Sequence, residues 1–348
     1  MEFFPLVEKT ILHSYPNDIK EVSAFLGRHG LRLDQDVEYT MAIYDHDSII
    51  ATGSFSGRIL KCIAVDKAYQ GMGTAARVVS HLVNEAYQRG HTHLFIYTKP
   101  NSGILFKNLG FFEIASVSDH VMLLENRSDG IQSYIKELKQ NKKEGSRIAS
   151  IVMNCNPFTL GHQYVIEKAA AENDVLHIFV LWEDRSSFPT EVRYHLIKEG
   201  TKHLSNVVVH KAKDYIISTA TFPSYFLKEN QDAVKTQVML DLKIFGTYIV
   251  PALGINRRYV GEEPYCPVTA AYNAFMQSML PDYGIEVVVV PRLTDSHAAI
   301  SASRVRKHIQ DGEMEKVKDL VPKTTYDFLI APENQALIEK IKNRLGRH

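Results

Sequence analysis

The sequence predicts an α/β protein of two domains, and three observations support this class. With 348 residues the chain is longer than one ordinary core needs, so two domains are expected. Each half contains an apolar, strand-like run that leads through a short glycine turn into a segment of helical periodicity. In the second half further apolar runs alternate with helical segments, which is typical of a parallel sheet covered by helices.

Composition and charge exclude several classes of protein. Hydrophobic residues make up 45% and charged residues 23% of the chain, which indicates a soluble globular protein. Lysine plus arginine equals aspartate plus glutamate at 40 each, so a general nucleic-acid binder is not expected. The three cysteines form no C-x-x-C pair, which argues against a zinc site or disulfides and favours the cytoplasm. No secretory signal or membrane span is predicted.

Residues 1–130 form the first predicted domain, and its most informative segment is a glycine turn. The run at 60–65 predicts a strand, and the apolar spacing of residues 74–90 predicts an amphipathic helix. Between them, QGMGTA (70–75) places glycines where the backbone can approach a ligand closely. The free N–H groups of the helix start favour an anion such as a pyrophosphate. The candidate anion-binding residues are Gln70, Gly71, Gly73 and Ala75.

This turn and one later segment resemble a known family. The spacing Gln-x-x-Gly-x-Ala is similar to the acetyl-CoA-binding turn of the GNAT acetyltransferases. The segment from Asn101 through LFKNLGFFEI resembles that family's later N…(F/Y)-x-x-x-G-F element. The resemblance implies a GNAT-like fold for residues 1–130. A shared fold does not carry a function with it, and no local residue indicates an acetyltransfer acid or base.

Residues 131–147 are predicted to connect the two domains. Their sequence, IQSYIKELKQNKKEGSR, is strongly charged and ends in Gly-Ser-Arg. We interpret it as a solvated connecting helix and linker that marks the domain boundary.

Residues 148–348 are predicted to form a doubly wound parallel sheet, Rossmann-like in its layers, with additional helices at the C-terminus. IASIVM (148–153) and VLHIFVLW (175–182) predict buried strands, and the helical segment between them predicts a right-handed βαβ unit. Three further runs, at 207–209, 248–250 and 287–290, are expected to extend the sheet.

The segment NPFTLGH (156–162) lies at the first strand-to-helix transition of this domain. His162 is expected beside the helix N-terminus, where the backbone favours anions. An imidazole there can donate to phosphate oxygens as a transition state gains negative charge. When the segment is taken alone, a histidine that only caps or packs at a helix start is the better explanation.

A second segment with anion donors favours the anion-binding interpretation of His162 over the structural one. ISASRVRK (300–307) follows another strand-like run and is expected to begin a helix. Ser301, Ser303 and Arg306, with Lys307 nearby, then form a second group of donors. Because both segments occur at strand-to-helix transitions, a functional interpretation is favoured.

Together the two segments resemble the nucleotidyltransferase superfamily with (H/T)-x-G-H and I-S-x-(S/T)-x-x-R motifs. The resemblance implies that they bind the triphosphate of ATP from opposite sides, with His162 and Arg306 as the catalytic residues. Thr159 stands where class I aminoacyl-tRNA synthetases have histidine, and no K-M-S-K-S element is present. Adenylyl transfer to a small molecule is therefore expected rather than tRNA charging. The implied ATP-binding residues are Asn156, Phe158, Thr159, Gly161, His162, Ser301, Ser303 and Arg306.

The order of motifs along the whole chain resembles the citrate lyase ligase family. Between the two ATP motifs lies the block GINRRYVGEEPYCPVTAAYNAFM (254–276). The resemblance implies that acetate is activated by ATP and Mg²⁺ as acetyl adenylate and then transferred to the prosthetic thiol of the citrate lyase acyl carrier. Arg257 and Arg258 are candidates for binding phosphate or the acetate carboxylate, and no Mg²⁺ ligand is assigned. The dephospho-coenzyme-A-like prosthetic group is expected to place its pyrophosphate on the QGMGTA turn.

Several alternatives remain open on the sequence alone. The segment with Glu191 and Arg193 is either the border of the acceptor site or an ordinary helix start. The whole chain is alternatively a small-molecule adenylyltransferase fused to an acetyltransferase domain, or a regulatory protein that senses a nucleotide and an acyl-CoA.

Overall fold

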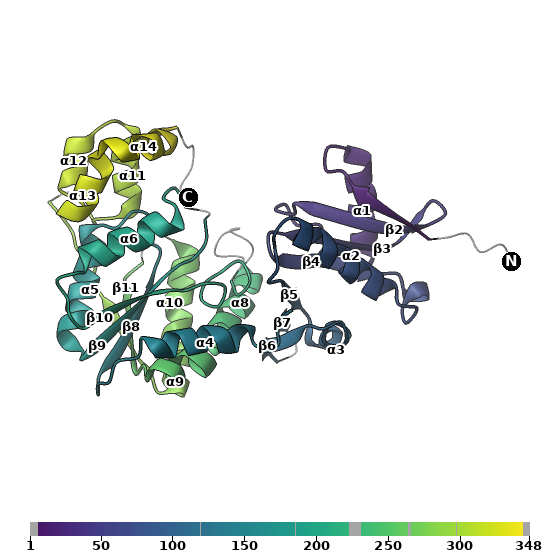
Figure 1. Ribbon diagram of the computed structural model, residues 1–348, viewed down its shortest axis with the longest axis horizontal. Coiled ribbons are helices and arrows are strands. Elements are labelled where there is room, and N and C mark those ends of the chain that lie inside the picture. Colours follow the sequence, from purple (N-terminus) through teal and green to yellow (C-terminus); the bar gives the residue numbers. More distant parts are fainter. Residues whose placement is uncertain are drawn as a thin grey trace. The chain divides into compact units, whose positions relative to one another are not determined.

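The computed structural model describes residues 6–118, 120–184, 186–222, 231–263, 266–296 and 298–343. It divides the chain into two compact units, Met1–Gly130 and Ile131–His348 (Figure 1). Both units combine helices with a sheet, so the predicted α/β class is confirmed.

A seven-stranded sheet forms the centre of the first unit, in the order β1-β2-β3-β4-β5-β7-β6. The strands β4 and β5 pair in parallel, whereas the other neighbours pair antiparallel. Helix α1 packs on one face, and α2 and α3 pack on the other. The bounds are β1 Val7–Ile11, α1 Pro16–Arg28, β2 Tyr39–Asp45, β3 Ser48–Ser56, β4 Ile59–Val65, η1 Lys67–Tyr69, α2 Thr74–Gln88, β5 Phe95–Thr98, α3 Pro100–Asn108, β6 Phe112–Val117 and β7 Val121–Glu125.

The second unit contains a five-stranded parallel sheet in the order β10-β9-β8-β11-β12. This is the predicted doubly wound arrangement, and the strand order reverses between β8 and β11. Ligands of such sheets bind beyond the carboxyl ends of the strands at this reversal point. The strand bounds are β8 Ile148–Met153, β9 Val175–Val180, β10 Val207–Lys211, β11 Arg257–Gly261 and β12 Glu286–Val290.

Helices cover both faces of this sheet. On one face α5 and α6 share a core with residues of β8 and β9. On the other face Phe245 packs edge-on against Phe179 of β9. The Tyr272 hydroxyl donates a hydrogen bond to Asp241, which joins α10 to α8. The bounds are α5 Leu160–Glu172, α6 Thr190–Gly200, α8 Gln231–Ile244, η2 Phe245–Ile249, α9 Val250–Leu253, α10 Pro267–Met279 and η3 Leu280–Tyr283.

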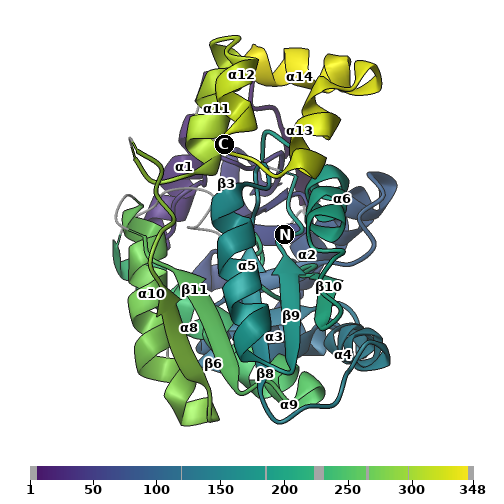
Figure 2. The same ribbon diagram turned by 90° about the vertical axis from the view of Figure 1, so that its left-hand side faces the viewer.

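The C-terminal helices form a cluster of their own. Residues of α11, α12, α13 and α14 share an apolar core with Phe188, and Figure 2 shows these helices gathered together. The backbone N–H of Leu160, the first residue of α5, donates to the Leu320 carbonyl at 3.0 Å. The cluster therefore contacts the turn that follows β8. The bounds are α11 Ala302–Gln310, α12 Met314–Lys318, α13 Lys323–Ile330, η4 Pro332–Asn334 and α14 Gln335–Lys342.

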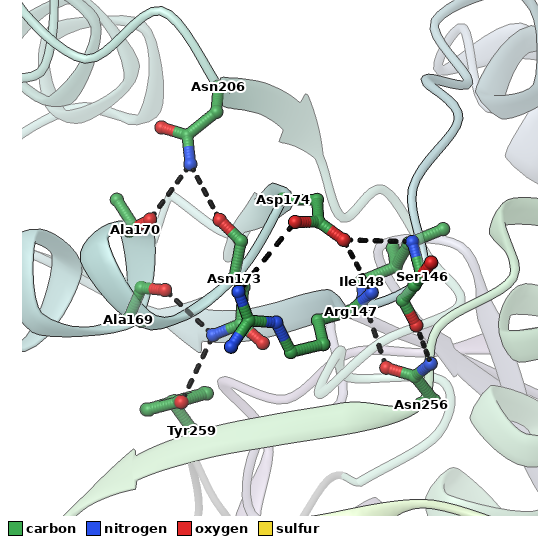
Figure 3. A network of polar contacts seen from close by, with 10 residues as sticks. All are labelled: Ser146, Arg147, Ile148, Ala169, Ala170, Asn173, Asp174, Asn206, Asn256 and Tyr259. Atoms are coloured by element: carbon green, nitrogen blue, oxygen red, sulfur yellow. Dashed lines mark hydrogen bonds and ion pairs between the residues drawn. The ribbon is translucent and has the colours of Figure 1, made fainter.

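Side-chain amides and a carboxylate join the strands at the opposite, amino edge (Figure 3). Asn256, just before β11, accepts from the Ile148 N–H at 3.0 Å, and Asp174 accepts from the backbone N–H groups of Ser146 and Arg147. Asn173 donates to the Tyr259 hydroxyl at 3.0 Å. These hydrogen bonds occupy polar groups at the amino edge of the sheet. A ligand is therefore expected at the carboxyl edge.

Two expectations of the sequence differ from the structure. The run at 248–250, expected to be a strand, is helical within η2 and α9, and β11 instead lies in the arginine-containing block after it. A short apolar run does not by itself distinguish a strand from a buried helix. The expected solvated connector contains helix α4 (Gly130–Gln140), which buries Tyr134 against the second unit. The Tyr134 hydroxyl donates to the Lys211 carbonyl at 3.0 Å, and its ring stacks on Tyr215.

Candidate active site

The T-x-G-H turn (residues 159–162) begins helix α5 directly beyond the carboxyl end of β8. Thr159 is the N-cap, and its hydroxyl oxygen accepts from the backbone N–H of His162 at 3.3 Å. The His162 ring reciprocates, because its Nδ1 accepts from the Thr159 backbone N–H at 3.1 Å. A capping box usually has glutamate or glutamine at this position. Here an imidazole takes that role, which fixes the ring at the helix N-terminus.

This hydrogen bond also determines which ring nitrogen can donate. Nδ1 is used as an acceptor, so the ring proton of neutral His162 lies on Nε2. Burial, and to a smaller extent the positive charge of Arg292, lowers the pKa of His162 to about 4. At neutral pH the ring is therefore an uncharged donor through Nε2, beside a helix end that attracts anions.

The second motif is in contact with this turn. Ser301 is the N-cap of α11 and accepts from the Arg304 N–H at 3.3 Å. A Cβ on Gly161 would lie 2.9 Å from the Ile300 carbonyl oxygen, so glycine is required there by the close approach of the two segments. Arg306 donates through Nη1 to the Asn156 carbonyl at 2.5 Å. The structure thus brings together two motifs that are separated by most of the domain.

The predicted nucleotide-contacting residues differ in accessibility. Phe158 is 0% exposed and packs against the backbone at Gly200, so it supports the turn from within the core. Asn156 is also buried and accepts from the Phe188 N–H at 2.9 Å. Thr159 is buried, with its hydroxyl occupied in the cap. These three residues shape the turn, whereas Ser303 is exposed at the start of α11.

Sequence reasoning missed Arg292, a cation close to His162. It follows β12 at the carboxyl edge of the sheet, and its charge contributes to the low pKa of His162. Glu263, from the block after β11, binds Arg292 Nη2 at 2.6 Å. The position of Arg292 directly after a predicted strand was the available signal. Pro264 and Tyr265 of the same block lie outside the described residues.

Arg193 has a structural role that decides the open question about its segment. It is 0% exposed and joins the ends of β8 and β9 to the loop before α6. Glu191 forms a surface ion pair with Lys211 at 3.0 Å. The ordinary helix-start interpretation is therefore the one that the contacts favour. Arg193 donates to the carbonyl oxygens of Asn154, Leu181, Glu183 and Phe188.

Arg257 and Arg258 are not brought to this turn. In the sheet register they pair with Ala149 and Ser150, near the amino end of β8. Arg257 forms an ion pair with Glu286 at 2.9 Å. Arg258 is buried on the other face of the sheet. Neither residue contacts the T-x-G-H turn.

The QGMGTA turn of the first unit lies between β4 and α2, as expected. Gly71 and Gly73 have φ values of 80° and 79°, a left-handed conformation that favours glycine. Gly73 is the N-cap of α2 and provides no side-chain hydrogen bond. The Gln70 side chain donates to the Val65 carbonyl at 3.2 Å, which holds the turn against the end of β4.

Comparisons with known proteins place the chain in a family. A family model described as the citrate lyase ligase C-terminal domain matches residues 148–329. A [citrate [pro-3S]-lyase] ligase from Haemophilus influenzae is 42% identical over 314 residues, covering 88% of this chain and 94% of that protein. The chain belongs to the citrate lyase ligase family. The Escherichia coli ligase of the same name is 41% identical, with 89% of each chain covered.

The chain also has shorter or weaker similarities to proteins outside this family. A phosphopantetheine adenylyltransferase from Staphylococcus haemolyticus is 41% identical over 64 residues, covering 18% of this chain and 40% of that protein. A solved GNAT-family acetyltransferase from Staphylococcus aureus is 13% identical, covering 34% of this chain and 98% of that one, with a TM-score of 0.28. A similarity this small carries no conclusion about activity. Among the described helices, none has the length and apolar character needed to cross a membrane.

Proposed function

We propose that this member of the citrate lyase ligase family activates acetate with ATP and acetylates the prosthetic thiol of the citrate lyase acyl carrier. One observation carries the proposal. The T-x-G-H turn and the start of α11 are in contact through Arg306 and Asn156, and Gly161 permits their close approach. Two groups of anion donors therefore face one reaction site beyond the carboxyl end of β8, the place expected for a nucleotide in this sheet.

In the first step a carboxylate oxygen of acetate attacks the α-phosphorus of ATP. A new P–O bond forms, the bond to the β-phosphate oxygen breaks, and pyrophosphate leaves with that electron pair. His162 donates its Nε2 proton in a hydrogen bond to the phosphate oxygens as charge develops. Arg306, together with Ser301 and Ser303, stabilises the departing pyrophosphate. Positioning and charge stabilisation suffice, so no enzyme nucleophile is required.

In the second step the prosthetic thiolate attacks the carbonyl carbon of acetyl adenylate. A C–S bond forms and the C–O bond to AMP breaks, so acetyl thioester and AMP are the products. The thiolate is the nucleophilic form. The residue that receives the thiol proton remains unassigned.

Magnesium enters this proposal as part of the nucleotide substrate. Within the described ranges no group of three or more His, Cys, Asp or Glu side chains could hold a metal ion. Mg²⁺ commonly keeps several waters and binds through substrate phosphates. The arrangement therefore suits MgATP as the species that binds. The three cysteines are free, which suits the cytoplasmic location that we propose.

The first unit is proposed to bind the prosthetic arm. Its QGMGTA turn leaves the first N–H groups of α2 without a side-chain cap. The turn glycines are exposed, and no atom lies within 4 Å of a Cβ built on either of them. A pyrophosphate can approach such a helix start closely.

The products of one incubation test the proposed function. The protein is incubated with MgATP and acetate, with and without deacetylated citrate lyase, and the nucleotides are separated. We expect AMP and pyrophosphate only when acetate is present, and acetylated carrier only when the lyase is added. A dinucleotide-like product would instead indicate the adenylyltransferase alternative. Absence of any turnover would leave the sensing alternative.

A further inference from the structure

Arg258 is a buried cation, and its Nη1 has no hydrogen-bond partner among the residues that the structure describes. The residue is 2% exposed. Its guanidinium carbon lies 4.5 Å from the centroid of the Phe245 ring. A guanidinium stays charged at every physiological pH and has five N–H donors. A buried charged group without a hydrogen-bond partner is strongly unfavourable, so an acceptor is expected beside Nη1.

Asp241, the carboxylate that attracts Arg258, does not supply that acceptor. Asp241 is 0% exposed and attracts Arg258 through space. Its Oδ1 accepts from the Ile217 N–H at 2.6 Å, and its Oδ2 accepts from the Tyr272 hydroxyl at 2.7 Å. The Thr221 side chain is a further hydrogen-bond partner. Asp241 is thus occupied by other donors, and it gives the Nη1 group of Arg258 no hydrogen bond.

The surroundings select a small monoanion with an apolar part. Phe245 lies over the guanidinium, and Tyr272 stacks on Phe222 with ring centroids 5.6 Å apart. Phe245 begins η2, a π-helical segment of a type that occurs frequently at functional sites. A phosphate would bring two negative charges next to buried Asp241, whereas a carboxylate brings one. A planar carboxylate also matches the guanidinium fork.

The location suits a substrate of the nucleotide site. Arg258 lies on β11, which pairs with β8, and its register partner Ser150 is three residues before Met153, the last residue of β8. That separation along a strand is about 10 Å. Asn273, next to Tyr272, donates to the Gly261 carbonyl at the carboxyl end of β11. Arg258 and the T-x-G-H turn therefore belong to the same pair of neighbouring strands: Arg258 lies on β11, the turn follows β8, and the strand order reverses between them.

We propose that Arg258 binds the carboxylate of the short-chain acid substrate, with its alkyl group against the aromatic rings of Phe245 and Tyr272. This inference rests on the proposed function for the identity of the acid. It assigns a binding role and no step of bond formation. Asp241 positions Tyr272 and balances the charge of Arg258 when the acid is absent.

Two measurements on the full-length protein test this role. Acetate-dependent exchange of pyrophosphate into ATP gives the KM for acetate and for ATP, and the melting temperature with acetate alone reports binding without turnover. In Arg258→Met we expect the acetate KM to rise more than tenfold, the ATP KM to change less than twofold, and the acetate-induced melting shift to vanish. Without acetate this variant is expected to melt lower than the wild type, because buried Asp241 loses the charge that balances it, so the acetate-induced shift is measured against each variant's own acetate-free melting temperature.

Two more variants keep the test decisive. Arg258→Lys keeps the charge but loses the fork, so a selective rise in the acetate KM is expected even if Arg258→Met fails to fold. Arg147→Met removes an exposed arginine near the amino end of β8, whose ion pair with Asp174 spans 3.8 Å, and should leave both KM values unchanged. An unchanged acetate KM and melting shift in both Arg258 variants would overturn the inference and indicate buried water as the partner.

Different experimental results would reject this inference and reject the proposed function. Acetate-dependent exchange that is equal in wild type and Arg258 variants rejects the acid site and keeps the ligase. An acetate melting shift that depends on Arg258, without any acetate-dependent exchange, keeps the binding site and rejects the ligase.

Discussion

The chain contains two glycine turns that join a strand to a helix, and they use glycine for different reasons. In the QGMGTA turn, Gly71 and Gly73 have positive φ values and face open space. In the T-x-G-H turn, Gly161 is glycine because the Ile300 carbonyl approaches it. The first helix start has no side-chain cap, whereas the second is capped by Thr159 and His162.

This difference suits two ways of binding phosphate, which the proposed function assigns to the two turns. The first turn offers backbone N–H groups to a ligand and depends on glycine conformation. The second turn uses its backbone for packing and presents one neutral side-chain donor, the Nε2 of His162, next to Arg306 from another segment. Binding of a carrier arm suits the first turn, and stabilisation of a transition state suits the second.

Removing the imidazole should produce the largest effect on chemistry. His162→Ala is expected to lower the rate of acetate-dependent pyrophosphate exchange by about 10²–10³-fold, the usual cost of losing a positioned transition-state donor. His203→Ala, at an exposed histidine paired with Glu167, should retain wild-type exchange. Retention of exchange in His162→Ala would mean that this turn also works through its backbone.

A methyl group at the close approach should separate the two motifs. In Gly161→Ala the added Cβ would meet the Ile300 carbonyl oxygen at 2.9 Å, so the T-x-G-H turn and α11 must move apart. We expect exchange to fall by about 10–100-fold through misplacement and stability to fall by about 1–3 kcal/mol. Gly71→Ala is the matched control, since it adds only about 1 kcal/mol of backbone strain in open space. Equal exchange rates in the two variants would contradict the packing role of Gly161.

The elements around both turns could be predicted because their signals are local. The strand at 148–153 and the helix after the T-x-G-H turn follow from the apolar patterns of their own residues, and both were found within a few residues of the predicted bounds. Strand β11 was missed because two arginines interrupt its apolar pattern. The run at 248–250 was assigned to a strand because it is β-branched and short. Motif order, in contrast, predicted two segments that the structure brings into contact, and their assignment to ATP is part of the proposed function.

The remaining site residues could not be predicted because their roles depend on tertiary contacts. Arg193 is a structural residue only because four carbonyl groups from two strand ends and a loop converge on it. Arg292 contributes to the low pKa of His162 because β12 ends near that histidine. The choice between Arg257 and Arg258 depends on which face of β11 each side chain occupies. No spacing in the sequence carries this information.

A charge at the first turn should weaken carrier binding without affecting adenylate formation. Gly73→Asp places a carboxylate where the pyrophosphate of the prosthetic group is proposed to lie. We expect the KM for the acyl carrier to rise roughly 5–10-fold, about 1 kcal/mol, with acetate-dependent exchange unchanged. Gly73→Asn is the matched control, because asparagine tolerates the left-handed conformation similarly and has no charge. An unchanged carrier KM in Gly73→Asp would make the first unit a scaffold.

Of the two turns, only the second contains a titratable ring, and the effect expected from it is a pH dependence of stability. The folded-state pKa of His162 is about 4, below its ordinary value of 6.5, because the ring is buried near Arg292. The unfolded chain therefore binds this proton first as the pH falls, so the stabilising contribution is present above pH 6.5 and is lost towards pH 4. Between pH 7 and 5, His162→Gln should lose about 2 kcal/mol less stability than the wild type in urea unfolding.

The slope that remains in His162→Gln should come largely from His177 and His210, a buried pair whose pKa values are lowered to about 3 and about 4. Substitution of the exposed His120 by glutamine should reproduce the wild-type curve. Parallel curves for wild type and His162→Gln would mean that the ring is not held neutral by its surroundings. In that case the T-x-G-H turn would have to bind phosphate with a charged imidazole, and the proposed donation from a neutral Nε2 would be wrong.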